Sequence, residues 1–287
     1  MSRIVYVNGR YLPYAQAAVH VEDRGFQLGD AIYEVCEVRG GHLIDEARHM
    51  ARLERSLGEL QIPRPMAPAA LAHVMREVIR RNRLRDGALY LQVSRGAGPR
   101  DFYFPGPDVV PTVVCLTRAL SPDVPAARAL SGIAVKSMPD IRWARCDIKT
   151  VMLLPACLAK EAARKEGANE AWFVDREGYV TEGASSNAWI VDGAGTVITR
   201  PLGTDILPGV TRATVRDVLQ KEQIGLVERP FLLGEARAAR EAFITSATQT
   251  VMPVVRIDGH AVGDGRPGPV AALLRQKFHQ FAAISDI

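Results

Sequence analysis

Two short segments carry an amine and a carboxylate that could act in one reaction. Lys149 lies in the segment DIKT, Asp147–Thr150, and Glu182 lies in TEGASSN, Thr181–Asn187. A lysine amine can form a Schiff base with an aldehyde, and a carboxylate can hold a protonated ring nitrogen. Most Lys and Glu residues are solvated surface charges. The pair therefore predicts a site for a pyridine aldehyde only together with the segments described next.

A place for a phosphate group follows further along the chain. The segment LPGVTR, 207–212, leads directly into a predicted helix. Val210 and Thr211 would present free backbone N–H groups and a hydroxyl at the start of that helix. The segment TSATQT, 245–250, offers a second set of hydroxyls and amides. Because the sequence contains neither GxxxxGKS/T nor GxGxxG, a nucleotide is not indicated, and the combination predicts pyridoxal 5'-phosphate.

The composition is ordinary for a soluble globular enzyme. Of 287 residues, 47% are hydrophobic and 24% charged, with a net charge of +4, which favours neither a nucleic acid nor a membrane as partner. No apolar run reaches the roughly 20 residues that cross a bilayer, and the chain starts with a predicted strand, 4–7, instead of a signal peptide. The 4 cysteines lack CxxC spacing and are expected to be free thiols in a reducing cytoplasm. The 6 histidines are dispersed, so no metal site is expected.

Helical and strand patterns alternate in both halves of the chain. Helices are predicted over 46–60, 67–81, 153–166, 210–221 and 269–281. Strands are predicted over 4–7, 31–38, 88–94, 111–117, 132–136, 170–174, 187–191, 195–199, 241–245 and 253–257.

A proline-rich stretch suggests where two domains meet. Residues 119–125, ALSPDVP, contain Pro122 and Pro125 and are the best candidate for a linker. The sequence therefore predicts a small N-terminal domain over 1–118, a linker over 119–125 and a C-terminal cofactor-binding domain over 126–287. Both domains are expected to be α/β or α+β, with a cleft at the linker.

Several ordered motifs give the chain a strong resemblance, over nearly its whole length, to the fold-type IV pyridoxal phosphate enzymes. This class contains the D-amino acid and branched-chain aminotransferases. The motifs are RGFQLGDAIYEV (24–35), HMARL (49–53), SRGAGPR (94–100), DIRWARCDIK (140–149), TEGASSN (181–187) and ILPGVTR (206–212). The resemblance implies a two-domain fold in which the larger, C-terminal domain has a barrel-like sheet. It also implies a homodimer with the active site near the subunit interface.

The resemblance also implies a role for each end of the cofactor. Lys149 would form the Schiff base and later move a proton between Cα and C4′. Glu182 would pair with the pyridinium nitrogen. The remaining cofactor-binding residues implied by the motifs are Arg52, Val210, Thr211 and Thr248 at the phosphate, Arg142 at the phenolic oxygen, and Ser185, Ser186 and Asn187 in the TEGASSN turn.

The residues expected to bind the substrate match the D-amino acid aminotransferases better than the branched-chain enzymes. In the D-specific enzymes a tyrosine, an arginine and a histidine two residues after that arginine bind the substrate carboxylate. Tyr33 and Arg100 match the first two positions, but Phe102 stands where the histidine would be, and Asp101 could compete for the Arg100 guanidinium. The expected reaction is transamination between a D-amino acid, such as D-alanine, and a 2-oxo acid, such as 2-oxoglutarate or pyruvate. A more apolar pocket could also admit (R)-amines.

Other activities share the same scaffold. A branched-chain L-amino acid aminotransferase and an aminodeoxychorismate lyase both remain open on the sequence. A binding module without catalytic activity is disfavoured by the intact Lys149 and Glu182. A serine hydrolase using Ser185 or Ser186 is disfavoured because no GxSxG motif is present.

Overall fold

The computed structural model describes residues 3–285 and divides them into two units, each built on its own sheet. The first unit contains 3–121, Ile148–Met152 and 283–285, and the second contains Pro122–Asp147 and Leu153–Ala282. The chain thus returns to the first unit twice, which differs from the simple division predicted at residues 119–125. The reason is backbone pairing at long range: Thr150 bridges to Ile32, and Ile284 bridges to Ile44.

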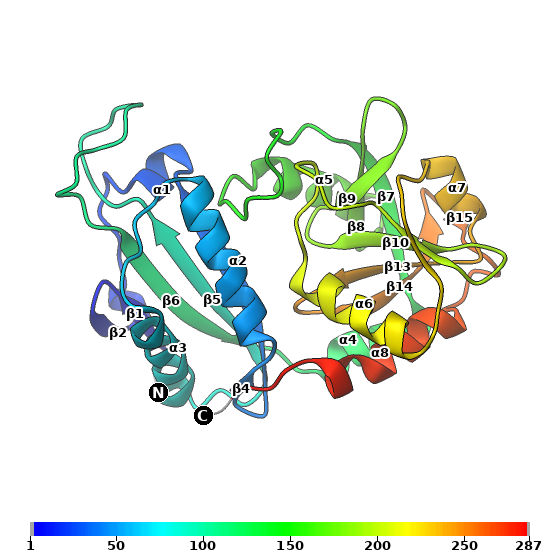
Figure 1. The fold of residues 1–287 in the computed structure, drawn as a ribbon, viewed down its shortest axis with the longest axis horizontal. Helices are drawn as coiled ribbons and strands as arrows, with labels where there is room; N and C mark the ends of the chain where they lie inside the picture. The colour runs from blue at the N-terminus through cyan, green and yellow to red at the C-terminus, as the bar shows by residue number, and fades with distance from the viewer. Residues whose placement is uncertain (1–2, 286–287) are drawn as a thin grey trace. The chain divides into compact units, whose positions relative to one another are not determined.

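The first unit is a six-stranded sheet whose strand pairs are all antiparallel. Helix α2 packs against β3, and α3 packs against β1 and β6 (Figure 1). In sheet order the strands are β2 (Arg10–Pro13), β1 (Ile4–Val7), β6 (Thr112–Ala119), β5 (Gly87–Ser94), β3 (Ala31–Arg39) and β4 (His42–Leu43). The helices are the 3₁₀ turn η1 (Tyr14–Gln16), α1 (Arg24–Leu28), α2 (Glu46–Glu59) and α3 (Pro68–Asn82).

The second unit is a larger, mixed sheet with its own aromatic core. Trp172, Phe173, Trp189, Phe231 and Phe243 are among its fully buried side chains. Its strands, in sheet order, are β12 (Leu226–Glu228), β11 (Val197–Thr199), β10 (Asn187–Val191), β13 (Glu241–Ser246), β14 (Thr250–Ile257), β7 (Ile133–Pro139), β8 (Glu170–Val174) and β9 (Val180–Gly183), with β15 (His260–Ala261) paired to β14. Its helices are α4 (Asp123–Ser131), α5 (Leu154–Lys165), α6 (Val210–Lys221), α7 (Leu233–Ala238) and α8 (Pro269–Phe281).

Helix α4 occupies part of the segment that was predicted to be a linker. Pro122 is its N-cap and Pro125 lies in its first turn. Proline is compatible with those positions because the first N–H groups of a helix have no intrahelical partner. The irregular stretch after β6 is therefore only residues 120–122.

The period-two alternation of β3 places neighbouring residues on opposite faces of the first sheet. Ile32, Glu34, Cys36 and Val38 are buried, whereas Tyr33 on the other face is partly exposed. Tyr33 and Glu34 therefore face opposite sides of the first sheet.

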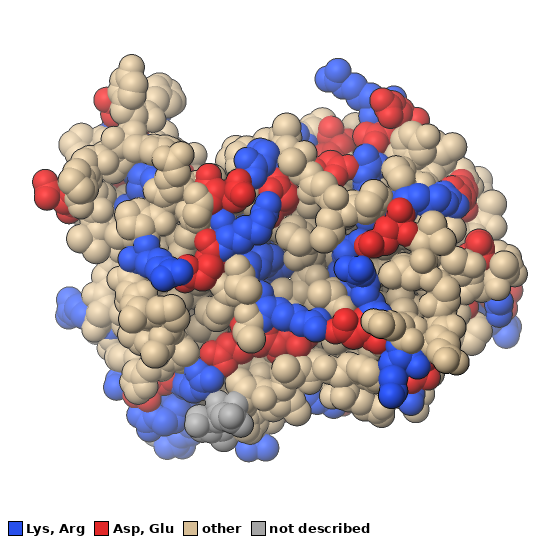
Figure 2. Space-filling view, in the orientation of Figure 1, with Lys and Arg blue, Asp and Glu red and all other residues tan. Residues whose placement is uncertain are grey.

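Charged side chains of both signs are interspersed on the face drawn in Figure 2. Among residues 3–285, no helix has the length and apolar character needed to span a bilayer. In the same range, no group of three or more His, Cys, Asp and Glu side chains could hold a metal ion. All four cysteines are free thiols.

Candidate active site

Lys149 and Tyr33, both predicted site residues, lie together in the first unit. The backbone of the Lys149 segment runs along the start of β3: the Tyr33 N–H donates to the Lys149 carbonyl at 2.9 Å, and the Val151 N–H donates to the Ala31 carbonyl at 3.1 Å. This pairing places the Lys149 Nζ 4.3 Å from the centroid of the Tyr33 ring. The Tyr33 ring in turn stacks on Tyr90, with centroids 5.6 Å apart. The predicted amine is thus held over an aromatic face.

Arg52 binds a buried carboxylate that the sequence analysis did not identify. Its Nε donates to Glu34 Oε1 at 2.8 Å and its Nη2 donates to Glu34 Oε2 at 2.7 Å, while His49 Nδ1 lies 2.8 Å from the same Oε2. Glu34 is 0% exposed. The available signal was a glutamate at a core-facing position of a strand, together with a histidine and an arginine three residues apart on one helical face. At least two nitrogens of the predicted phosphate ligand are therefore engaged by protein.

The charges in this cluster are set by its burial and its hydrogen bonds. Burial by itself would raise the pKa of the Glu34 carboxyl, but the Arg52 charge and the hydrogen bonds from Arg52 and His49 lower that pKa to about 2. Burial also lowers the pKa of His49 despite the neighbouring carboxylate. Near neutral pH the cluster is consequently a Glu–Arg ion pair with a neutral imidazole that donates to the carboxylate.

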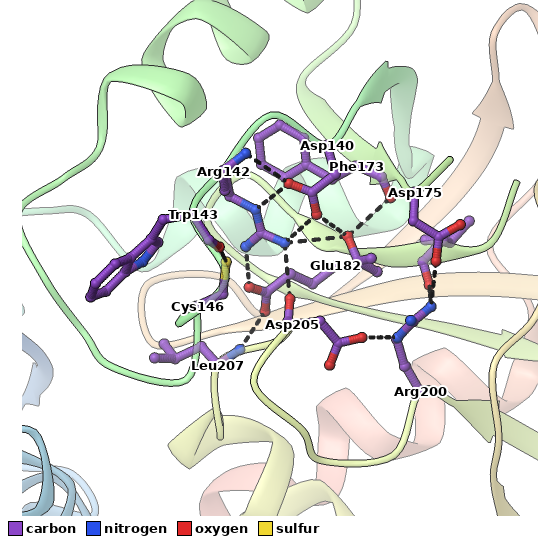
Figure 3. A network of polar contacts seen from close by, with 12 residues as sticks. Asp140, Arg142, Trp143, Cys146, Phe173, Asp175, Glu182, Arg200, Asp205 and Leu207 are labelled. Carbon is purple, nitrogen blue, oxygen red and sulfur yellow. Dashed lines mark hydrogen bonds and ion pairs between the residues drawn. The ribbon is translucent and has the colours of Figure 1, made fainter. Parts of the chain in front are cut away.

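In the second unit, Glu182 lies on β9 and accepts hydrogen bonds from three residues. Arg142 Nη1 donates to Oε1, as Figure 3 shows, while the Asn187 side-chain amide donates to Oε2 at 3.0 Å and the Leu207 N–H donates to it at 3.1 Å. The carboxylate is nearly buried, with its residue 5% exposed. A carboxylate with these donors is fixed in position.

Arg142 directs its guanidinium toward protein acceptors. Its Nε and Nη2 donate to the two oxygens of Asp140 at 3.0 and 2.7 Å, and Nη2 also donates to Thr181 Oγ1 and to the Asp205 carbonyl (Figure 3). Burial alone would raise the pKa of Asp140, but the hydrogen bonds and charge of Arg142 lower it. Arg142 thus links Glu182 to Asp140, and its contact with a phenolic oxygen stays a prediction. Asp140 was not predicted as a site residue, because a spacing of two residues from Arg142 has no distinctive pattern.

The hydroxyls of Ser185 and Ser186 bind a second carboxylate of this unit, Glu170, and their contact with a cofactor stays a prediction. Both donate to Glu170 Oε2, at 2.7 and 3.3 Å, and Lys160 Nζ donates to the same oxygen at 3.3 Å. Glu170 is 0% exposed. A fully buried carboxylate requires such donors, because leaving it unpaired would be costly.

The start of α6 has the features of a phosphate site. Gly209 is its N-cap and, within the described residues, no side chain caps the helix. A Cβ at Gly209 would lie 2.0 Å from Asn187 Oδ1, so only glycine fits there. Val210 and Thr211, in the first turn, are buried, whereas Thr248, in the turn after β13, is exposed.

An unpaired hydroxyl lies in the same hydroxyl-rich segment. The Oγ of Ser246 is buried and, among residues 3–285, has no hydrogen-bond partner. Ser246 ends β13, the strand on which α6 packs. A phosphate oxygen would satisfy this hydroxyl, so the residues present fit the phosphate of pyridoxal phosphate. Thr248, the residue predicted at the phosphate, belongs to the same run of hydroxyls as Ser246.

The predicted substrate residues of the loop after β5 are exposed. The Arg100 guanidinium lies 5.8 Å from the ring centroid of Phe102, which is 82% exposed. Asp101 does not pair with Arg100 in the described residues; its Oδ1 accepts from the Tyr103 N–H at 3.4 Å. The expected competition for the Arg100 guanidinium is therefore not observed.

Comparisons with known proteins agree with these features. A family model described as amino-transferase class IV matches residues 31–257. The chain is 38% identical over 278 residues to a D-alanine aminotransferase of Staphylococcus haemolyticus, covering 96% of this chain and 97% of the relative. It is also 38% identical over 266 residues to a D-alanine aminotransferase of Bacillus licheniformis, covering 93% and 92% of the two chains.

Solved structures with the same fold are more distant in sequence. A T.th. branched-chain amino acid aminotransferase with pyridoxamine 5'-phosphate superposes with a TM-score of 0.89 at 24% identity, covering 98% of this chain and 94% of the other. A branched-chain amino acid aminotransferase from Escherichia coli gives a TM-score of 0.85 at 24% identity, with coverage of 97% and 94%. At this identity the likeness establishes a shared fold. The predicted two-domain fold is thereby confirmed.

Proposed function

Because the chain belongs to the class IV aminotransferase family, we propose that it transfers the amino group of a D-amino acid, such as D-alanine, to a 2-oxo acid, such as 2-oxoglutarate or pyruvate. The protein is a pyridoxal phosphate-dependent aminotransferase. The observation that carries the proposed substrate class is the 38% identity, over nearly the whole chain, to D-alanine aminotransferases.

The reacting end of the site is proposed to use Lys149 and Glu182. When bound, pyridoxal phosphate supplies an aldehyde carbon and an electron-withdrawing pyridine ring. Lys149 provides the amine that holds the cofactor covalently and later carries the proton between the substrate Cα and C4′. Glu182, fixed by its three donors, keeps the ring nitrogen protonated. Asn187 acts through Glu182, to which its amide donates.

The phosphate end is proposed to use the start of α6. Val210 and Thr211 offer backbone N–H groups and a hydroxyl. Arg52 adds a positive charge that Glu34 orients, and Thr248 and the unpaired Ser246 hydroxyl add donors from the turn after β13. Arg142 serves mainly to hold Glu182.

The substrate carboxylate is proposed to bind Arg100, with Tyr33 beside Lys149. Phe102 offers no hydrogen-bond donor, so the carboxylate has fewer partners than with an imidazole at this position. A site with one donor fewer is also less selective for carboxylates, which supports a side activity on (R)-amines.

Half-reactions of the purified holoenzyme test the substrate class. The yellow cofactor form is mixed with D-alanine, L-leucine or (R)-1-phenylethylamine, and loss of its absorbance is followed. We expect D-alanine to convert it much faster than L-leucine does. Conversion by L-leucine alone would identify a branched-chain enzyme, and release of pyruvate from aminodeoxychorismate without an amino acceptor would identify the lyase.

The role of Arg100 is tested by Arg100→Ala. Losing a charge-assisted hydrogen bond should raise the KM for D-alanine by about 10–100-fold. The reaction of (R)-1-phenylethylamine or hydroxylamine, which carry no carboxylate, should change little. Equal effects on D-alanine and on these amines would remove Arg100 from the carboxylate site.

We further propose that the protein acts as a homodimer in the cytoplasm. The four free thiols support a reducing compartment, and exposed Leu154 and Leu158 on one face of α5 support an oligomer. Sedimentation of the holoenzyme at several concentrations tests the dimer, and a concentration-independent monomer would contradict it.

A further inference from the structure

The loop that carries Arg100 has little apolar burial of its own. It follows β5 and precedes β6 in the first unit, and its Phe102 and Tyr103 side chains are both 82% exposed. A segment with so few buried contacts is held only by the few specific interactions that it makes. Those interactions decide where the Arg100 guanidinium points.

Two arginines, Arg24 on α1 and Arg95 at the start of the loop, hold it at either side of Phe102 and Tyr103. The Arg24 Nη1 donates to the carbonyl of Asp101 at 2.8 Å. The Arg95 guanidinium lies 3.6 Å from the centroid of the Phe104 ring, a cation–π contact. The backbone next to Arg100 is thus tied to Arg24, and the far side of the loop is tied to Arg95.

A single carboxylate, Asp30, orients both of these arginines. Its Oδ2 accepts from Arg24 Nε at 2.8 Å and from Arg95 Nε at 2.7 Å, and its Oδ1 accepts from Arg95 Nη2 at 3.0 Å. The Asp30 side chain is 12% exposed, and both arginines are more buried. Because these side chains are largely shielded from water, their charge-assisted hydrogen bonds hold both guanidinium groups firmly in position.

The two arginines differ in what else fixes them. Arg95 also donates to the carbonyls of Leu60 and Gln61, just after α2. The Arg24 guanidinium donates to Asp30 and Asp101, while the Arg24 backbone N–H donates to the Gly96 carbonyl at 2.9 Å. Loss of the Asp30 carboxylate should therefore release Arg24, and with it Asp101, more than Arg95.

The local sequence explains why Asp30 is in place. Gly29 ends α1 with a φ of 71°, a left-handed conformation that favours glycine, and the chain then turns directly into β3. Asp30 is thereby placed between the helix that carries Arg24 and the strand that carries Tyr33. The motif RGFQLGD thus contains both the arginine and its carboxylate.

We propose that Asp30 is a positioning residue for recognition of the substrate carboxylate: by holding Arg24 and Arg95 it fixes the loop that presents Arg100. This inference rests on the proposed role of Arg100. Asp30 acts through the arginines and contacts no substrate. Its loss should weaken binding of carboxylate substrates and leave the chemistry at Lys149 intact.

The test is Asp30→Asn in the holoenzyme, with Asp108→Asn as matched control. Asp108 is an exposed aspartate of the same loop, so its substitution makes the same change of charge. Asp30→Asn should raise the KM for D-alanine about tenfold while kcat and the rate of reaction with hydroxylamine stay near those of the control. A fall in kcat with KM unchanged, or equal losses with hydroxylamine, would overturn the proposal.

A second readout does not depend on activity. Chymotrypsin cleaves after Phe102 and Tyr103, and Asp30→Asn should speed that cleavage at least about threefold relative to Asp108→Asn, because the loop opens more often. Arg24→Gln removes both the tie to Asp101 and the ion pair with Asp30, and it leaves Asp30 bound to Arg95. It should reproduce both effects if Asp30→Asn folds poorly. Unchanged cleavage in both variants would overturn the proposal.

Arg100→Ala separates the two levels of inference. If Arg100→Ala leaves the KM for D-alanine unchanged, the proposed role of Arg100 is wrong. If Arg100→Ala raises that KM but Asp30→Asn and Arg24→Gln do not, only the role of Asp30 is wrong.

Discussion

Each unit of this protein contains an arginine–glutamate ion pair with a residue predicted to bind the cofactor. The proposed main ligand is the arginine in the first pair and the glutamate in the second. In the first unit, Arg52 is the proposed ligand of the phosphate, and Glu34 holds it. In the second unit, Glu182 is the proposed partner of the ring nitrogen, and Arg142 holds it.

The surroundings of the two pairs differ accordingly. Glu34 and its two donors, His49 and Arg52, come from one strand and one helix and form a closed, fully buried cluster. Arg142 instead connects Glu182 to Asp140 and to the backbone of the segment before α6 (Figure 3). In the first cluster most of the contribution to the free energy of unfolding depends on one carboxylate, whereas in the extended network it is shared among several partners.

The largest effect is expected when the buried cluster loses the Glu34 carboxylate. Glu34→Gln leaves the buried Arg52 charge without its ion-pair partner and should lower the free energy of unfolding by about 3–5 kcal/mol. Urea unfolding of the apoenzyme measures it. The control is Glu46→Gln on α2, whose partner Arg76 is partly exposed and whose loss should cost only about 0–1 kcal/mol. Equal losses of unfolding free energy in Glu34→Gln and Glu46→Gln would contradict this prediction.

Lowering the pH should remove the stabilisation by Glu34 without a mutation. The pKa of Glu34 is lowered to about 2 in the folded protein from its ordinary value of 4.5, which applies to the unfolded chain. Its contribution is therefore complete above pH 4.5 and is lost as the pH falls toward 2. The whole contribution is roughly 3 kcal/mol. Unfolding free energies measured from pH 6 to pH 3 should fall more steeply in the wild type than in Glu34→Gln. Parallel curves would mean that Glu34 titrates alike in both states.

A smaller effect is expected in the extended network. Asp140→Asn removes one of the two carboxylates bound to Arg142, but Glu182, Thr181 and the Asp205 carbonyl still accept from it. The free energy of unfolding should fall by about 1.5–3 kcal/mol. Cofactor titration of the refolded apoenzyme should show weaker binding, because Glu182 is less firmly held. A loss as large as that of Glu34→Gln would erase the distinction between the two pairs.

The smallest effect is expected at His49. His49→Phe keeps a ring in the core but removes one neutral donor from Glu34, which retains both bonds from Arg52. The loss of stability should be about 1 kcal/mol at pH 8, measured by urea unfolding. Because burial lowers the pKa of His49, the histidine resists protonation when folded, so the variant should approach the wild type as the pH falls below 6.5. Divergence of the two below that pH would show that the imidazole is charged.

The elements of the fold were largely predictable where local pattern decides them. Helix α6 and strand β10 have the predicted bounds, 210–221 and 187–191, because apolar periodicity marks them directly. Helix α4 was missed because its two prolines resemble a linker, although both lie where a helix accepts proline. The return of Ile148–Met152 to the first unit could not be predicted, since backbone pairing with β3 leaves no local signal.

The candidate site was predictable in its residue types and less so in its partners. Lys149 and Tyr33 were expected together and lie together. Glu182, Ser185, Ser186 and Asn187 of the TEGASSN turn were all predicted to bind the cofactor. In the structure Asn187 donates to Glu182, while Ser185 and Ser186 donate to Glu170, a partner that was not predicted. The sequence shows that a turn carries hydroxyls, but it does not show which buried carboxylate accepts their hydrogen bonds.

The pairing of the Lys149 segment with β3 has a consequence for the order in which the protein is made. All strands of the first sheet have been synthesised by residue 119, but the start of β3 lacks its Ile148–Met152 partner until some thirty residues later, and Leu43 lacks Ser285 until residue 285 has been added. The first unit is therefore finished last. One edge of β3, the strand that carries Tyr33, stays unpaired until the segment that carries Lys149 has been synthesised. The contact between Lys149 and the Tyr33 ring therefore forms only after both segments are present.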